Sequence, residues 1–169
     1  RRVAASPATV GRWRQQPGPT CPAARQRTHT GVENETNEAR AQVLEALNRL
    51  PLEAAMGETH LARLAAVGEL ESFSAGATLF EEGGAAVALR IIVDGRVALL
   101  IEQPGAEPSV VGTVGRGDLL GWSALRPDAR WQTTARAAKA GRCLRFPAGA
   151  LRELCDSDHE LGYHVMRHA

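Results

Sequence analysis

The chain has 169 residues, of which 44% are hydrophobic and 23% charged, the composition of one globular domain with a short appendage. Residues 1–30 hold six Arg and no acidic residue, so the rest of the chain carries 14 of the 20 basic and all 19 acidic side chains. This mildly acidic remainder disfavours broad nucleic-acid binding, and no apolar run reaches the roughly 18 residues of a transmembrane helix. Three dispersed cysteines suit a reducing compartment without structural zinc, so we expect a cytoplasmic protein with no membrane association.

Residues 1–35 differ in character from the rest of the chain. They contain four of the nine prolines, many Ser, Thr and Gln, and no periodic apolar face. Such a segment buries too little apolar surface to offset the entropy lost on ordering. We interpret it as a disordered basic tail, or as a non-native segment upstream of the true start, and place one folded domain at residues 36–169.

The folded domain begins with a helical segment over residues 36–68. Apolar side chains recur there at helical spacing twice, before Pro51 and again before Gly68, which predicts two helices. Residues 148–169 regain helical periodicity and predict two further helices. Asp158 stands where it can cap the last one, which carries Leu161 and Val165.

Residues 70–146 between these helices read as strands. Short apolar runs separated by glycine-containing turns occupy residues 78–80, 89–93, 97–101, 110–114, 133–137 and 143–146. Asp94-Gly95 between the second and third run predicts a two-residue hairpin turn. The expected fold is therefore mainly β, an antiparallel β-roll or jelly roll with flanking helices.

Catalytic constellations are missing from this pattern. A cupin-like metalloenzyme would need histidines on its strands, yet residues 61–158 contain none. His164 and His168 share a helical face but supply only two ligands near the chain end. We find no catalytic triad, carboxylate dyad or phosphate-binding loop. The sequence therefore predicts no enzymatic activity, no metal site and no cofactor.

An ordered set of glycine motifs carries the most information. Phe73-Ser74-Ala75-Gly76-Ala77-Thr78-Leu79-Phe80-Glu81-Glu82-Gly83 is followed by Val93-Asp94-Gly95-Arg96-Val97 and then by Gly117-Asp118-Leu119-Leu120-Gly121. With these gaps, the chain from about residue 44 resembles the cyclic nucleotide-binding domain family, the sensor module of catabolite-activator-type regulators. In that family a glycine turn and the following amides cradle a cyclic phosphate, a Glu holds the ribose, and an Arg pairs with the phosphate.

The side chains of this cassette depart from the family. The Glu position is Trp122, and the phosphate Arg position, counted back from Thr134-Ala135-Arg136-Ala137, is Trp131. The cassette Gly-Trp-Ser-Ala-Leu resembles a divergent subgroup of the family. By position, the resemblance implies these ligand-site residues: Gly117, Gly121, Trp122, Ser123, Ala124, Arg130, Trp131 and Gln132. Arg130 is the one credible substitute charge.

Two arrangements of the indoles remain open. Trp122 and Trp131 either pack on each other and fill the ancestral pocket, or line a pocket for a flatter or less charged molecule. In both cases the loss of acid and base together predicts no binding of cyclic AMP or cyclic GMP.

The resulting hypothesis is a non-enzymatic sensor or regulatory module, degenerate for cyclic nucleotides, that binds another small ligand or a protein partner. Leu161, Val165 and Met166 could form a weak homodimer seam, or else cover the open side of the roll. The sequence stops inside the last helix, so we expect no direct DNA binding. The alternative is a fragment of a cyclic-nucleotide-responsive transcription regulator without its DNA-binding domain.

Overall fold

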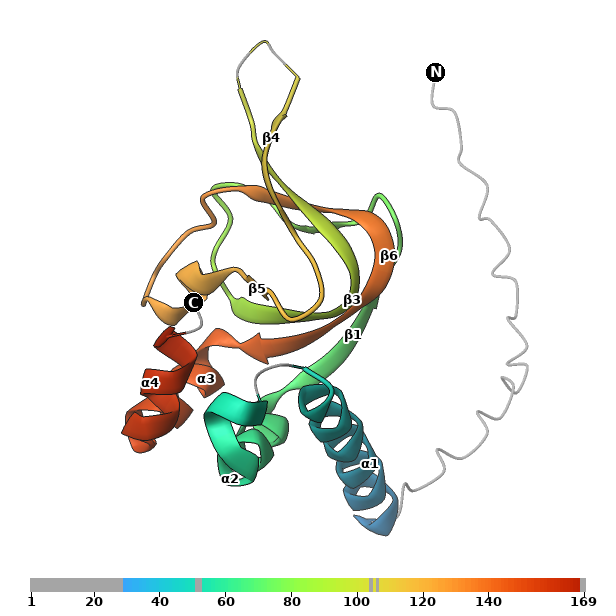
Figure 1. The fold of residues 1–169 in the computed structure, drawn as a ribbon, viewed down its shortest axis with the longest axis vertical. Helices are drawn as coiled ribbons and strands as arrows, with labels where there is room; N and C mark the ends of the chain where they lie inside the picture. The colour runs from blue at the N-terminus through green and yellow to red at the C-terminus, as the bar shows by residue number, and fades with distance from the viewer. Residues whose placement is uncertain (1–28, 51–52, 104, 106, 168–169) are drawn as a thin grey trace, which may run out of the picture.

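The computed structural model describes residues 29–50, 53–103, 105 and 107–167. In chain order, its elements are α1 (His29–Asn48), α2 (Glu53–Val67), β1 (Glu69–Phe73), β2 (Thr78–Phe80), β3 (Ala88–Ile101), β4 (Ser109–Val114), β5 (Leu119–Leu120), the 3-10 helix η1 (Trp122–Leu125), β6 (Thr134–Pro147), α3 (Ala148–Ser157) and α4 (His159–Arg167). The α-helices gather on one side of a rolled sheet, and the β3–β4 hairpin projects from the other side (Figure 1).

The sheet is antiparallel throughout its named pairs. Its strand order is β1-β6-β3-β4, with β2 added to β6 and β5 added to β3. The predicted fold class, an antiparallel β-roll with flanking helices, is confirmed. The sequence pattern does not predict β1 or the two-residue β5. Polar residues at positions 69, 71 and 72 leave β1 without the apolar run that marks the other strands.

The hairpin predicted at Asp94-Gly95 is wrong. β3 continues through both residues, and its pairing with β6 shifts register between Ile92 and Val97. Gly95 does have a positive φ of 94°, but a Cβ on Gly141 of β6 would lie 2.1 Å from the carbonyl oxygen of Asp94. The glycine therefore serves a bulge where two long strands bend against each other at close approach.

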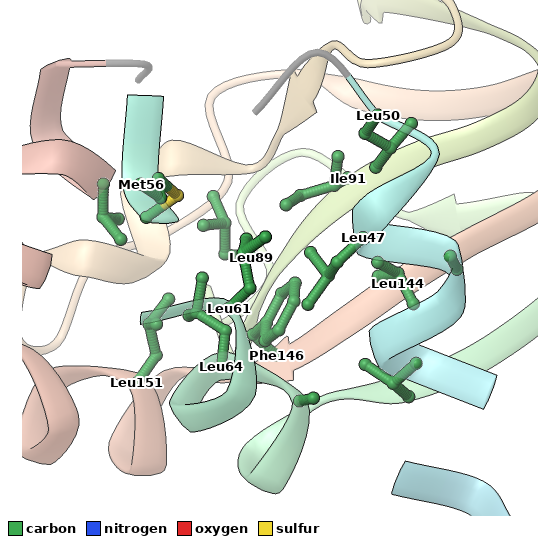
Figure 2. Packing of buried hydrophobic residues seen from close by; sticks show 14 of the residues in the cluster. Leu47, Leu50, Met56, Leu61, Leu64, Leu89, Ile91, Leu144, Phe146 and Leu151 are labelled. Atoms are coloured by element: carbon green, nitrogen blue, oxygen red, sulfur yellow. The ribbon is translucent and has the colours of Figure 1, made fainter. Parts of the chain in front are cut away.

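Alternate residues of β3 face two different cores. Leu89 and Ile91 pack in a cluster with the helices, together with Phe146 of β6 (Figure 2). Ile92 points to the opposite face and packs inside the roll with Leu120. The period of two along the strand therefore lets one β-strand pack against the helical layer on one side and line the interior of the roll on the other.

The first helix begins earlier than the sequence pattern indicated. α1 starts at His29, so residues 29–35 are helical, whereas the predicted tail extended to residue 35. Residues 35–42 are all exposed, and burial begins only at Val43. No apolar face marks these early turns, which explains why periodicity missed them. The tail prediction for residues 1–28 lies outside the described residues.

The last helix, α4, is capped by Asp158 as predicted, and its apolar face packs inside the domain. The backbone N–H of Leu161 donates to Oδ1 of Asp158 at 3.1 Å. Leu161 and Val165 are buried in the cluster beneath the helices, whereas Met166 is 63% exposed. Of the two alternatives for this face, the structure supports the one in which Leu161 and Val165 cover the roll, because both are buried in the cluster that includes Leu89 and Ile91 of β3, whereas the homodimer seam stays a prediction.

Candidate functional site

The candidate site is built around a sharp turn between β5 and η1. Gly121 joins them with φ 82° and ψ 37°, a left-handed conformation that side chains disfavour. A Cβ at this residue would also lie 2.8 Å from Cζ3 and 2.9 Å from Cη2 of Trp131. Both the backbone and the neighbouring indole therefore require glycine here.

Trp131 is held rigidly on the inner side of this turn. Its backbone N–H donates to the carbonyl of Gly84, and its carbonyl accepts from Gly83, both at 2.9 Å. The indole is 5% exposed and stacks on Phe80 with ring centroids 4.1 Å apart and planes 18° apart. The ring thus lies against both Phe80 and the α-carbon of Gly121.

Trp122 takes a different position. It begins η1 and is 51% exposed, so it is not buried by Trp131, whose stacking partner is Phe80. Both indoles line a cavity of about 220 Å³ at the turn. Its lining consists of Phe80, Leu99, Leu119, Leu120, Gly121, Trp122, Ser123, Trp131, Gln132 and Thr133. This arrangement favours the lined pocket over two indoles that fill the space against each other.

The lining of this cavity is apolar and uncharged. Within the described part of the chain, it includes no Asp, Glu, His, Lys or Arg, and its polar side chains are those of Ser123, Gln132 and Thr133. A charged ligand group buried there would lose its hydration without gaining an oppositely charged partner. The cavity can hold an apolar body and offer it a few hydrogen bonds at one edge.

A second, polar cavity of about 330 Å³ adjoins the first. Its lining consists of Glu82, Ser123, Arg126, Ala129, Arg130, Trp131 and Gln132. Arg130 lines this cavity and not the apolar one, and its Nη1 donates to the carbonyl of Gly83 at 2.7 Å. The substitute charge expected from the sequence is therefore absent from the lining of the apolar cavity.

The structure separates the predicted site residues into three groups: five that line the apolar cavity, Arg130 that lines the polar cavity alone, and two that line neither. Gly121, Trp122, Ser123, Trp131 and Gln132 come together around the apolar cavity.

Gly117 and Ala124 fall outside both cavity linings. Gly117 is a turn residue with φ 86° whose N–H donates to the carbonyl of Ile92, and Ala124 is a fully buried residue within η1. The ligand contacts that the resemblance implies for Gly117 and Ala124 therefore stay predictions, since neither residue lines the apolar or the polar cavity.

Several cavity residues were missed by the sequence analysis. Phe80 stood inside the quoted motif, but nothing local indicated that its ring would stack on residue 131. Leu99 could have been found from the alternation along residues 97–101, because it follows Val97 by two on the face that packs inside the roll. Of the residues in the polar cavity, Glu82 lies inside the quoted motif, and Arg126, like Arg130, lies in the loop from which it could turn toward the site, although neither arginine occupies the phosphate Arg position.

The groups whose pKa is shifted lie away from these cavities. Burial raises the pKa of the Cys143 thiol to about 11, with Glu71 adding to the effect, so this thiol stays protonated at neutral pH. Arg90 lies beside it, 7% exposed, with Nε 3.3 Å from Glu71 and with Nη1 unpaired. Cys143, Glu71 and Arg90 line neither of the two cavities at the turn.

Metal binding and membrane spanning are two further functions on which the described residues bear. No group of three His, Cys, Asp or Glu side chains lies close enough there to hold a metal ion. No helix among them has the length and apolar character needed to cross a membrane.

Comparison with known proteins agrees with this geometry. The family model described as "Cyclic nucleotide-binding domain" matches residues 70–158, more than half of the chain. No curated protein shows significant sequence similarity to it.

Solved structures give the same fold. A candidate cyclic nucleotide-binding protein from Geobacter metallireducens GS-15 aligns with TM-score 0.64 and 27% identity, over 73% of this chain and 89% of its own. The N-terminal domain of a transcriptional regulator from Streptomyces coelicolor A3(2) aligns with TM-score 0.62 and 26% identity, over 72% and 85%. The regulatory domain of Toxoplasma gondii PKA, solved with cAMP, aligns with TM-score 0.65 and 16% identity, over 79% and 51%.

Proposed function

This chain belongs to the cyclic nucleotide-binding domain family, and we propose that it is a regulatory module whose cradle no longer takes cyclic AMP or cyclic GMP. In its place the module binds another small ligand through the apolar cavity at Gly121. The observation that carries this proposal is the position of Trp131, whose buried ring lies against Gly121 where the family resemblance expects an arginine.

The electrostatic argument supports loss of the cyclic phosphate. A cyclic nucleotide carries one negative charge on its phosphate, and an amide-only cradle leaves that charge without a cation. Removing one partner of a buried ion pair typically costs about 3–5 kcal/mol. That is roughly two to four orders of magnitude in affinity. Arg130 lines the polar cavity and not the apolar one, and its Nη1 donates to the carbonyl of Gly83, so we do not expect it to supply the missing charge over Gly121.

The steric argument points the same way. The apolar cavity measures about 220 Å³. Sites for drug-sized ligands usually measure about 300–1,000 Å³. On its own, without the adjoining polar cavity, this space takes a body smaller than a complete nucleotide, and the flat faces of Trp122 and of the Trp131–Phe80 stack suit an apolar ring.

A binding role also suits the chemistry of the lining better than a catalytic one. Proton transfer or nucleophilic attack needs a titratable side chain within hydrogen-bond reach of the reacting atom. The described residues that line the apolar cavity offer only two hydroxyls and one amide as polar side chains. We therefore propose a sensor that reports occupancy to the rest of a regulatory system, in keeping with its family.

Isothermal titration calorimetry of the full chain with cyclic AMP and cyclic GMP tests the proposal. We expect no heat of binding up to millimolar nucleotide, from protein whose folding is verified by circular dichroism. Micromolar affinity for either nucleotide would overturn the proposal. If heat does appear, the same titration on Trp122→Ala shows whether the nucleotide enters the cavity that Trp122 lines.

A further inference from the structure

The two cavities at the turn are neighbours with opposite character. Ser123, Trp131 and Gln132 line both of them, so these side chains lie at the boundary between the apolar space and the polar one. Gln132 is exposed, which leaves the boundary between the two spaces accessible from solvent. A ligand that extends past this boundary would place one end in each environment.

The polar cavity carries a positive excess. Arg126 and Arg130 line it, against the single carboxylate of Glu82. That carboxylate is already engaged, because its Oε2 accepts the backbone N–H of Glu102 at 3.0 Å. Arg130 uses one N–H on the carbonyl of Gly83 and keeps its other donors available. The cavity therefore favours one anionic group with planar acceptor geometry.

The arrangement differs from that of a phosphate cradle. Positive charge lies in the polar cavity with Arg126 and Arg130, while the space over Gly121 holds the Trp131 ring. A suitable ligand must therefore carry its charge at one end, separated from its apolar body. A carboxylate on a short arm meets this condition, whereas a phosphate fused into a ribose ring does not.

We propose that the two cavities form one site for a small amphipathic carboxylic acid. Its apolar body lies against Trp122 and the Trp131–Phe80 stack, and its carboxylate pairs with Arg126 and Arg130. The inference rests on the proposed function, because it assigns a ligand class to the same cavity.

The test compares acids with their neutral amides. The probes are 3-phenylpropanoate, indole-3-acetate and octanoate, each paired with its amide, titrated into the ¹⁵N-labelled full chain. Affinity is read from the indole N–H signals of Trp122 and Trp131. We expect at least one acid to bind about two- to five-fold more tightly than its amide, since Arg126 and Arg130 are exposed and an ion pair at exposed side chains contributes up to about 1 kcal/mol.

Variants assign the two halves of the site. Arg126→Gln combined with Arg130→Gln should abolish the preference for the acid while leaving the weaker binding of the amide. Trp122→Ala should weaken acid and amide alike. Arg136→Gln is the matched control, because this arginine is exposed on β6 and lines neither cavity, and it should bind as the unaltered chain does.

The outcomes separate this inference from the proposed function. Equal binding of acid and amide, no binding of any acid, or an acid preference that survives the double arginine variant would each overturn the inference. Cyclic AMP is titrated in parallel with the acids. Its binding would overturn the proposed function, whereas failure of the acids with no cyclic AMP binding overturns the acid assignment alone.

Discussion

Gly121 and Trp131 constrain each other at the centre of the site. The glycine tolerates the left-handed turn, and its missing Cβ makes room for the six-membered ring of the indole. Gly121→Ala should lower the free energy of unfolding by about 2 kcal/mol or more, through left-handed strain and overpacking together. Urea unfolding followed by circular dichroism measures the change, and a red shift of indole fluorescence should accompany it as Trp131 is displaced.

Gly149→Ala is the matched control for this substitution. Gly149 lies near the start of α3, and a Cβ there would meet no atom within 4 Å. Alanine is the better helix former by about 1 kcal/mol, so this change should leave stability equal or slightly higher. A Gly121→Ala protein as stable as the Gly149→Ala protein would show that Trp131 moves away from the turn without cost.

At single positions, the sequence indicates which residue types stand in the site, but it does not indicate which side chains contact one another there. That Trp122 and Trp131 replace an acid and a base follows from counting residues along a motif. The stacking of Trp131 on Phe80 and the half exposure of Trp122 do not follow from that count, because they depend on contacts between segments that are far apart in the sequence. Ala124 shows the same limit, since its position in the motif matched while its side chain points into the interior.

At the scale of elements, local sequence signals do not show whether a strand ends or continues, because that depends on the strand it pairs with. An Asp-Gly pair indicates a backbone that accepts a positive φ, and Gly95 has one. Whether that residue closes a turn or serves a bulge depends on the partner strand, here the close approach of Gly141 to Asp94. Strand β6 was likewise predicted as two runs, since no local pattern shows that a strand continues through its bend.

The capping of α4 offers an element-level prediction with a pH dependence. The backbone N–H of Leu161, aided by Arg63 and His60 of α2, holds the pKa of Asp158 below its ordinary 3.8. A carboxyl with a depressed folded-state pKa stabilises fully above its ordinary pKa and loses that contribution as the pH falls through the folded value. We therefore expect the Tm of the unaltered protein to fall as Asp158 becomes protonated in acid.

Two substitutions separate the cap from the ion pairs. Asp158→Asn keeps a good capping acceptor but loses the charge, whereas Asp158→Ala loses both, so Tm at neutral pH should fall more for alanine. Both variants should lack the acid-dependent part of the Tm profile that Asp158 supplies. Asp156→Asn, on the exposed face of α3, is the control and should follow the unaltered profile. Identical profiles for Asp158→Asn and the unaltered protein would contradict the assigned role of the charge.

At the scale of the whole molecule, β3 and β6 connect the helical layer to the interior of the roll. Leu144 and Phe146 of β6 pack with the helices, whereas Cys143 packs inside the roll. The carbonyl of Ala124 in η1 also accepts a hydrogen bond from Arg152 of α3 at 2.8 Å. The turn that lines the cavity is thus tied to the helices both through the shared strands and directly.

This shared framework predicts that the domain unfolds as one unit. Leu61 of α2 is fully buried among the helices and lies outside both cavity linings, so Leu61→Ala should lower the free energy of unfolding by about 2–5 kcal/mol. Far-UV circular dichroism reports the helices, and fluorescence of Trp122 and Trp131 in a Trp13→Phe background reports the site. The two transitions should shift together to lower urea and remain superimposable, as two-state unfolding requires. Val111→Ala on exposed β4 should shift neither of them. Loss of helical signal at a urea concentration that leaves the indole signal intact would show instead that the roll holds its site without the helices.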